Sequence, residues 1–249
     1  MLEVQDLSVN YRGVNALMNV SFCLAPGLLV GVIGPNGAGK STMIKAMLGL
    51  IPAASGIVKF RGRMLQKQRR YCAYVPQRSQ IDWDYPATVL TVVMMARTPH
   101  TGWFRATSRQ SEEIVADALR RVGMWELRHR QIGELSGGQQ QRVFLARALA
   151  QEAEIFFFDE PLAGIDKKTE GIIFDIFSQL KAEGKTLLVA SHEWGKSLNQ
   201  YDRLLLLNQR LIAYGFPEDV MTIDNIQDAY GQGLKSQLLH ERAEAVYFC

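Results

Sequence analysis

The sequence predicts an α/β protein in which buried strands alternate with helices. Three observations indicate this fold class. Short, unbroken apolar runs at residues 155–158 and at the centre of the segment 186–191 are typical of parallel strands covered on both faces. Segments with apolar residues at helical spacing separate such runs. Polar residues follow several runs directly, and ligands of open α/β sheets bind at these carboxyl ends of the strands.

The composition is that of an ordinary globular protein. With 249 residues, 47% hydrophobic and 21% charged, the chain can bury a substantial core as one α/β domain with insertions or two small domains. A formal net charge of +3 is too small to indicate a nucleic-acid partner. Its cysteines, Cys23, Cys72 and Cys249, are scattered and odd in number. They favour neither a disulfide framework nor a zinc site, and they fit a reducing cytoplasm.

No stretch of the sequence predicts membrane insertion. The first residues carry acids and alternate in polarity, whereas a signal peptide needs a basic start and an apolar core. Apolar runs such as 204–207 are far shorter than the roughly 20 residues of a spanning helix. We therefore expect any membrane association to go through a partner protein.

The first two elements are expected to be half-buried antiparallel strands. Residues 2–11 and 16–24 alternate between apolar and polar, and Arg12 and Gly13 lie between them. Tyr11 ends the first strand. It is either an ordinary strand aromatic or a platform for a nucleotide base, a contact worth ~1–3 kcal/mol.

A glycine-rich turn between a buried strand and a helix predicts a phosphate-binding site. Residues 34–42 read Gly-Pro-Asn-Gly-Ala-Gly-Lys-Ser-Thr and follow the apolar run 28–33. Glycines let successive backbone N–H groups converge on one anion, and the helix start adds the positive end of its dipole. Lys40 then supplies a cation for the β- and γ-phosphates, and Ser41 a hydroxyl for Mg²⁺.

The next elements are two short strands followed by a mostly helical region. Residues 56–62 and 71–75 have strand patterns, and the second strand leads to Gln77, whose amide is well placed to reach a site. Residues 78–150 break the strand and helix alternation. Within them the run 89–96 is nearly all apolar, so it is either core or a groove for another protein.

A second anion site is predicted at the start of the helix that runs to residue 150. Ser136 is a suitable N-cap, and the helix dipole adds positive charge there. Gly137 and Gly138 leave the backbone open. A cap alone would explain Ser136 but would not require the two glycines.

Acidic and imidazole side chains end the later strands. Asp159 and Glu160 follow the run 155–158, where Asp159 can hold Mg²⁺ through water and Glu160 can polarise an attacking water. His192 follows the run 186–191 and is a candidate contact for a γ-phosphate. A helix over 172–180, a hairpin of 203–207 with 210–214, and a helical tail complete the expected elements.

Together these motifs resemble the ATP-binding cassette (ABC) family up to about residue 215. Residues 34–42 match its Walker A motif, Gln77 its Q-loop, 135–139 its signature sequence, 155–160 its Walker B motif, and His192 its switch histidine. The resemblance implies a P-loop NTPase core, an antiparallel β subdomain and an inserted helical subdomain. The corresponding division is an ABC ATPase domain over 1–215, with the insertion at approximately 78–150, and a C-terminal helical tail over 216–249.

The resemblance also implies an ATP hydrolase that uses ATP and Mg²⁺ and acts as a head-to-tail homodimer, since one chain cannot close a site. The implied catalytic residues are Glu160, His192 and Gln77, and the implied metal ligands are Ser41, Gln77 and Asp159. The implied nucleotide contacts are Tyr11, Gly34, Asn36, Gly37, Gly39, Lys40, Ser41, Thr42, Ser136, Gly137, Gly138, Gln139 and Asp166.

Two segments depart from the common family pattern. Residues 161–166 read Pro-Leu-Ala-Gly-Ile-Asp, where many members have Ser-Ala-Leu-Asp before the last position. Asp166 is retained, so we expect communication between the two sites of a dimer to be retained as well. Glu193 follows His192 where an aspartate is common, and the carboxylate is kept.

Within the family, residues 76–86 are similar to ATPase subunits of importers for manganese, zinc or iron, and 102–105 and 162–166 point the same way. The implied protein is peripheral on the cytoplasmic face of the inner membrane. Its segment 81–97 would receive the coupling helix of a permease, and an extracytoplasmic metal-binding protein would deliver the ion. The expected ion is manganese, with zinc and iron as rivals. The alternative is a soluble ABC ATPase of iron–sulfur cluster assembly.

Overall fold

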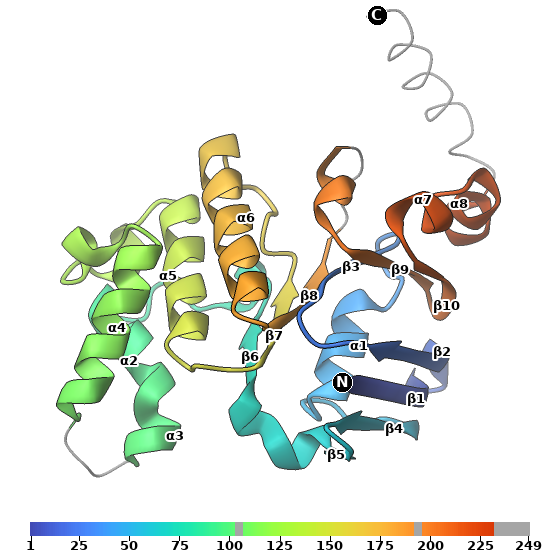
Figure 1. Ribbon diagram of the computed structural model, residues 1–249, viewed down its shortest axis with the longest axis horizontal. Helices are drawn as coiled ribbons and strands as arrows, with labels where there is room; N and C mark the ends of the chain where they lie inside the picture. The colour runs from blue at the N-terminus through green and yellow to red at the C-terminus, as the bar shows by residue number, and fades with distance from the viewer. Residues whose placement is uncertain (103–106, 192–195, 232–249) are drawn as a thin grey trace, which may run out of the picture.

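The computed structural model describes residues 1–102, 107–191 and 196–231. Its centre is a six-stranded sheet with the order β10-β9-β3-β8-β7-β6 (Figure 1). All neighbouring pairs are parallel except the hairpin of β9 and β10. The strands are β3 (Leu29–Ile33), β6 (Cys72–Val75), β7 (Ile155–Asp159), β8 (Thr186–Ala190), β9 (Arg203–Asn208) and β10 (Arg210–Gly215).

The central strands are apolar throughout because both of their faces are covered. Along β7, Ile155 and Phe157 belong to one hydrophobic core, whereas Phe156 and Phe158 belong to the other. All five residues of β7 are buried, and each phenylalanine contributes about 1.5–3 kcal/mol through its burial. The predicted parallel, doubly covered strands are confirmed.

The second sheet is antiparallel and lies beside the first, with the order β2-β1-β4-β5. The antiparallel pairing predicted for residues 2–11 and 16–24 is confirmed. Helix α1 lies between the two sheets, where Met43, Ile44 and Met47 are buried in the core that both sheets share (Figure 1). These elements are β1 (Leu2–Tyr11), β2 (Val14–Leu24), β4 (Ser55–Phe60), β5 (Arg63–Met64) and α1 (Lys40–Met47).

A helical lobe lies at the far end of the molecule from the antiparallel sheet (Figure 1). The apolar run at 89–96 is mostly core, since Val89, Val92, Val93 and Ala96 are all buried there. Within the run 89–96, Met95 is exposed. The helices of the lobe are α2 (Val89–Met94), α3 (Thr98–Thr101), α4 (Arg109–Arg121) and α5 (Gly137–Leu149).

The remaining helices flank the central sheet. Helix α6 (Lys167–Ala182) begins five residues before the predicted 172, because Asp166 caps it by accepting a hydrogen bond from the Thr169 backbone N–H. Helices α7 (Pro217–Val220) and α8 (Ile223–Tyr230) lie against the β9 and β10 hairpin. Short 3₁₀ turns occur at Leu65–Tyr71, Arg78–Gln80, Met95–Arg97, Trp125–Leu127, Ile132–Glu134 and Lys196–Gln200.

None of the helices in the described ranges combines the length and apolar character needed to cross a membrane.

Candidate functional site

The predicted phosphate cradle connects β3 to α1. Its glycines are needed because the backbone passes very close to its neighbours. A Cβ atom at Gly34 would lie 2.0 Å from the carbonyl oxygen of Leu207, and one at Gly39 would lie 2.7 Å from that of Ala16. Gly39 is also the N-cap of α1, and no side chain caps the helix there. The first N–H groups of α1 therefore have no side-chain acceptor and suit an anion.

Lys40 folds back over this loop. Its Nζ donates hydrogen bonds to the carbonyl oxygens of Gly34 (2.7 Å) and Pro35 (3.0 Å). Burial lowers the pKa of Lys40, whereas the nearby carboxylates of Glu160 and Asp159 act to raise it. A cation held by two carbonyl oxygens can exchange them for phosphate oxygens, which carry more negative charge.

Ser41 and Asp159 form the centre of the site. The Ser41 hydroxyl donates to Asp159 Oδ1 over 2.6 Å, although the two residues lie 118 positions apart in the chain. Asp159 is fully buried at the end of β7. Burial raises the pKa of its carboxyl, and the hydrogen bond from Ser41 is the largest opposing influence. These adjacent oxygens are hard ligands of the kind that Mg²⁺ prefers, so the residues present fit that ion.

Tyr74 is a member of this cluster that the sequence did not identify. Its hydroxyl donates to Asp159 Oδ2 over 3.3 Å from the neighbouring strand β6. Burial and the Asp159 charge together raise the pKa of this phenol, so it stays a neutral donor. The only signal in the sequence was a tyrosine three residues before Gln77, and nothing local links it to Asp159.

Glu160 and Gln77 are in direct contact. The Gln77 Nε2 donates to Glu160 Oε2 over 2.8 Å. Glu160 has a left-handed backbone (φ 51), which costs a non-glycine residue about 1–2 kcal/mol. Its backbone N–H donates to the carbonyl of Ala190 (3.0 Å), so strand β8 holds this turn in place. The structure thus brings Lys40, Ser41, Gln77, Asp159 and Glu160 into one cluster.

The predicted second anion site lies at the start of α5, where a capping box satisfies two of the backbone N–H groups. Ser136 and Gln139 form a capping box, in which Ser136 Oγ accepts from the Gln139 N–H and Gln139 Oε1 accepts from the Ser136 N–H. Both glycines face the ends of side chains from other elements. A Cβ at Gly138 would lie 2.8 Å from Thr169 Oγ1, and one at Gly137 would lie 2.9 Å from Arg78 Nη1.

Asp166 lies beside this helix start. Its carboxylate accepts from both the N–H (3.0 Å) and the hydroxyl (2.8 Å) of Thr169, and these bonds lower its pKa.

Tyr11 is 48% exposed at the end of β1. This exposure is compatible with both an ordinary strand aromatic and a platform for a nucleotide base, so the stacking role stays a prediction. His192 lies outside the described residues.

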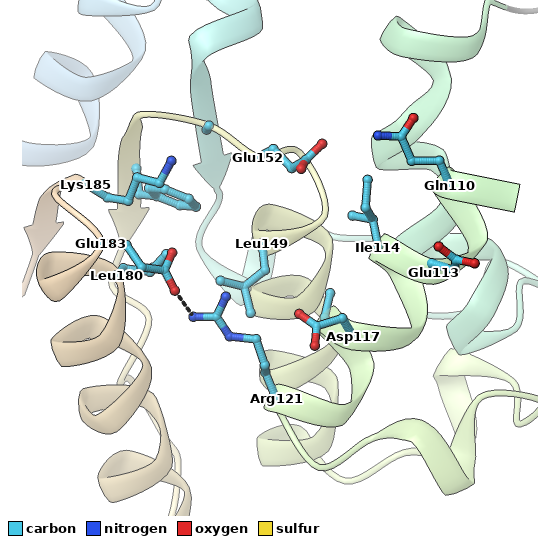
Figure 2. Close-up of a pocket in the computed structure, with 13 residues that line it drawn as sticks. Gln110, Glu113, Ile114, Asp117, Arg121, Leu149, Glu152, Leu180, Glu183 and Lys185 are labelled. Atoms are coloured by element: carbon cyan, nitrogen blue, oxygen red, sulfur yellow. Dashed lines mark hydrogen bonds and ion pairs between the residues drawn. The ribbon is translucent and has the colours of Figure 1, made fainter. Parts of the chain in front are cut away.

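A cavity of about 410 Å³ lies elsewhere, between α4, the end of α5 and the end of α6. Arg121 of α4 spans it and donates to Glu183 at 2.9 Å, while Glu152 and Lys185 also face this region (Figure 2). None of the cradle residues lines it. This cavity is therefore separate from the predicted nucleotide site.

Comparison with known proteins identifies the family. Residues 17–163 match the family model described as ABC transporter. The chain belongs to the ABC transporter family. A solved ABC cassette in its ADP conformation superposes with a TM-score of 0.78 and 26% identity, covering 96% of this chain and 98% of that one. The P-loop NTPase fold with its two subdomains is thereby confirmed.

Relatives within the ABC family are similar over most of their length. The chain is 48% identical over 230 residues to the manganese transport system ATP-binding protein MntB of Halalkalibacterium halodurans, covering 92% of each. It is 46% identical over 237 residues to the zinc transport system ATP-binding protein TroB of Treponema pallidum, covering 95% of this chain and 89% of TroB. The predicted resemblance to metal-importer ATPases is confirmed, and the chain is an ABC-type ATP hydrolase.

Proposed function

We propose that this chain is the ATP-hydrolysing subunit of an importer for divalent metal ions, with manganese as the expected ion and zinc and iron as rivals. The observation that carries the proposal is the 46 to 48% identity to relatives named for manganese and zinc transport. The similarity of residues 76–86 to the corresponding segment of metal importers agrees with this proposal. The cargo ion would bind to other subunits, because the residues assigned here serve ATP.

The cradle residues are assigned to the ATP phosphates, with Lys40 exchanging its two carbonyl partners for β- and γ-phosphate oxygens. Ser41, Asp159 and Gln77 are assigned to Mg²⁺, which when bound neutralises charge on the transferring phosphoryl group. The hydrogen bond of 2.6 Å between Ser41 and Asp159 supports this assignment, since it already holds two ligand oxygens together.

Glu160 is assigned as the general base that orients and deprotonates the attacking water. Such a group contributes a factor of ~10²–10⁴ to the rate. Its contact with Gln77 supports the role, because the amide fixes the carboxylate beside the proposed metal ligands. We assign His192 to the γ-phosphate and Tyr11 to the base.

A second copy of the chain completes each site in this proposal. Its segment of Ser136, Gly137, Gly138 and Gln139, together with Asp166, would cover the nucleotide held by the first copy, and a two-fold axis would create two such sites. The other partner is a membrane permease, as expected for an ATP-binding subunit of a transport system. Exposed Tyr85 and Met95 support a docking face for its coupling helices at residues 81–97, on the cytoplasmic side.

The test is ATPase activity of the chain co-expressed with its membrane subunit in lipid, with a binding protein loaded with Mn²⁺, Zn²⁺ or Fe²⁺. We expect stimulation by the manganese-loaded form above the unloaded form. Stimulation by another loaded form would replace the ion but retain import. Absence of any stable membrane complex would overturn the proposal and favour the soluble iron–sulfur assembly ATPase, which the names of the relatives above do not support.

A further inference from the structure

Arg78, the residue after Gln77, connects the proposed catalytic cluster to the start of α5. Its guanidinium donates to Gln140 Oε1 through Nε (3.1 Å) and Nη2 (2.8 Å). Gln140 is 4% exposed, and its Nε2 donates to the carbonyl of Ile132 over 3.2 Å. The acceptor is therefore fixed in orientation, and Arg78 meets it with two donors at once.

The guanidinium has further neighbours, although Arg78 as a whole residue is exposed. It lies so close to the first turn of α5 that a Cβ at Gly137 would be 2.9 Å from Nη1 and 3.0 Å from Cζ. Trp83 lies on another side, with Arg78 Cζ 5.7 Å from its ring centroid, and the Trp83 indole N–H donates to the Arg78 carbonyl (3.1 Å). Trp83 itself packs edge-on against Phe144 of α5 at 5.3 Å.

This position is not one that helix stability alone would select. A cation at a helix N-terminus is opposed by the helix dipole. Arg78 nevertheless lies against the first turn of α5, and the glycine at 137 is what leaves room for it. Its positive charge also adds to the field of the N–H groups around Ser136, where the proposed function requires an anion.

We propose that Arg78 is a positioning residue that couples the Gln77 and Glu160 contact to the orientation of the signature segment. One end of this connection is the 2.8 Å hydrogen bond between Gln77 and Glu160, and the other is the two-donor contact of Arg78 with Gln140. Because Gln77 and Arg78 are adjacent, movement of one displaces the other. The inference rests on the proposed function, in which Ser136 to Gln139 cover the nucleotide of a second copy.

The test compares Arg78→Met, Arg78→Lys and Gln140→Met with the control Arg109→Met. Met keeps an unbranched side chain but removes the hydrogen-bond donors. Lys keeps the charge but loses the planar arrangement of donors in the guanidinium. Arg109 is a suitable control because it is an exposed arginine of the same lobe, whose ion pair is with Glu113 four residues on.

Three quantities are measured: ATP affinity of the single subunit, ATP-driven dimerisation in a Glu160→Gln background, and kcat. We expect Arg78→Met to leave the affinity unchanged but to weaken dimerisation and lower kcat, each about tenfold, the scale of one lost charge-assisted contact. Gln140→Met should reproduce this loss, Arg78→Lys should recover part of it, and the double variant should be no worse than either single one. The control should behave as the parent.

Parental dimerisation and kcat in Arg78→Met would overturn the inference, as would a loss confined to ATP affinity. If Arg78→Met does not fold, Gln140→Met and Arg78→Lys decide the question by the same criteria. The proposed function is tested separately with the unaltered chain. It would be overturned if that chain hydrolyses no ATP and its Glu160→Gln form does not dimerise with ATP.

Discussion

Helices α1 and α5 both have glycines at their starts, yet the N-termini of the two helices are capped differently. Ahead of α1, the N-cap is Gly39 and no side chain caps the helix, while Lys40 lies over the loop. At the start of α5, the side chains of Ser136 and Gln139 each accept a hydrogen bond from the backbone N–H of the other residue, which forms a capping box. At the first start no side chain caps the helix, whereas at the second the capping box satisfies the N–H groups of Ser136 and Gln139, and the glycines pack against Arg78 and Thr169.

This difference teaches that glycine before a helix has at least two structural causes. At Gly34 and Gly39 the neighbouring atoms include backbone carbonyls, which cannot move aside. At Gly137 and Gly138 the neighbours are side chains of Arg78, Thr169 and Asp166. The α5 glycines thus allow side-chain contacts between the lobe, the Q-loop segment and α6, in addition to any exposure of the backbone.

The largest effect is expected from Glu160→Gln, in the cluster beside the phosphate cradle. Hydrolysis should fall by a factor of ~10²–10⁴, since the amide cannot accept the proton from water. ATP binding should remain, because the cradle is untouched, and a closed dimer should accumulate. Steady-state ATPase assays and size-exclusion chromatography with ATP measure the two properties. A variant that hydrolyses ATP at the parental rate would remove Glu160 from the base role.

Alanine substitution at the two helix starts should separate them by stability. Gly34→Ala should lower the free energy of unfolding by about 3 kcal/mol or more, since its Cβ would meet the Leu207 carbonyl at 2.0 Å. Gly138→Ala should cost less than about 1 kcal/mol, because the Thr169 hydroxyl can rotate and alanine favours the helix. Urea denaturation followed by circular dichroism measures both. Equal losses would show that the packing at the two starts is equally rigid.

Asp159→Asn should change how stability depends on pH. The pKa of Asp159 is raised by burial, so the native state binds this proton more tightly than the unfolded chain does. Wild-type stability should therefore fall as pH rises between the unfolded and native pKa values, with a slope of up to about 1.4 kcal/mol per pH unit. The variant should lack this component and be more stable than the wild type above the window. Denaturation curves at a series of pH values without nucleotide test this, with Asp117→Asn as an exposed control.

Ser136→Ala is expected to have a small effect that is confined to stability. Loss of the N-cap should lower the free energy of unfolding by about 1 kcal/mol, with no change in the ATP affinity of the single subunit. Lys40→Met, in contrast, should weaken ATP binding strongly. Isothermal titration with a non-hydrolysed ATP analogue compares the two variants. Weakened binding in the Ser136→Ala monomer would mean that α5 contacts the nucleotide of its own chain.

Much of the fold and the site was predictable, because the relevant signals are local. The doubly buried strands, the cradle and the Ser136 cap each depend on residues within about ten positions of one another. Tyr74 and the Arg78 contact with Gln140 were not predictable. Tyr74 meets Asp159 from 85 positions away, and Arg78 meets Gln140 from 62 positions away. The start of α6 was also missed, since the sequence was interpreted from its apolar residues, and Asp166 was considered for the nucleotide and for communication between two sites but not as a helix cap.

The sequence by itself predicted a phosphate-binding turn, because glycines with a following lysine place donors over a few adjacent residues. It also determined the family, through motifs whose spacing is visible along the chain. Only the tertiary structure decided which carboxylate contacts Ser41, which amide contacts Glu160, and which side chains lie against Gly137 and Gly138. Those outcomes depend on the packing of segments that are distant in the chain, and side-chain contacts of this kind leave no periodic pattern in either segment.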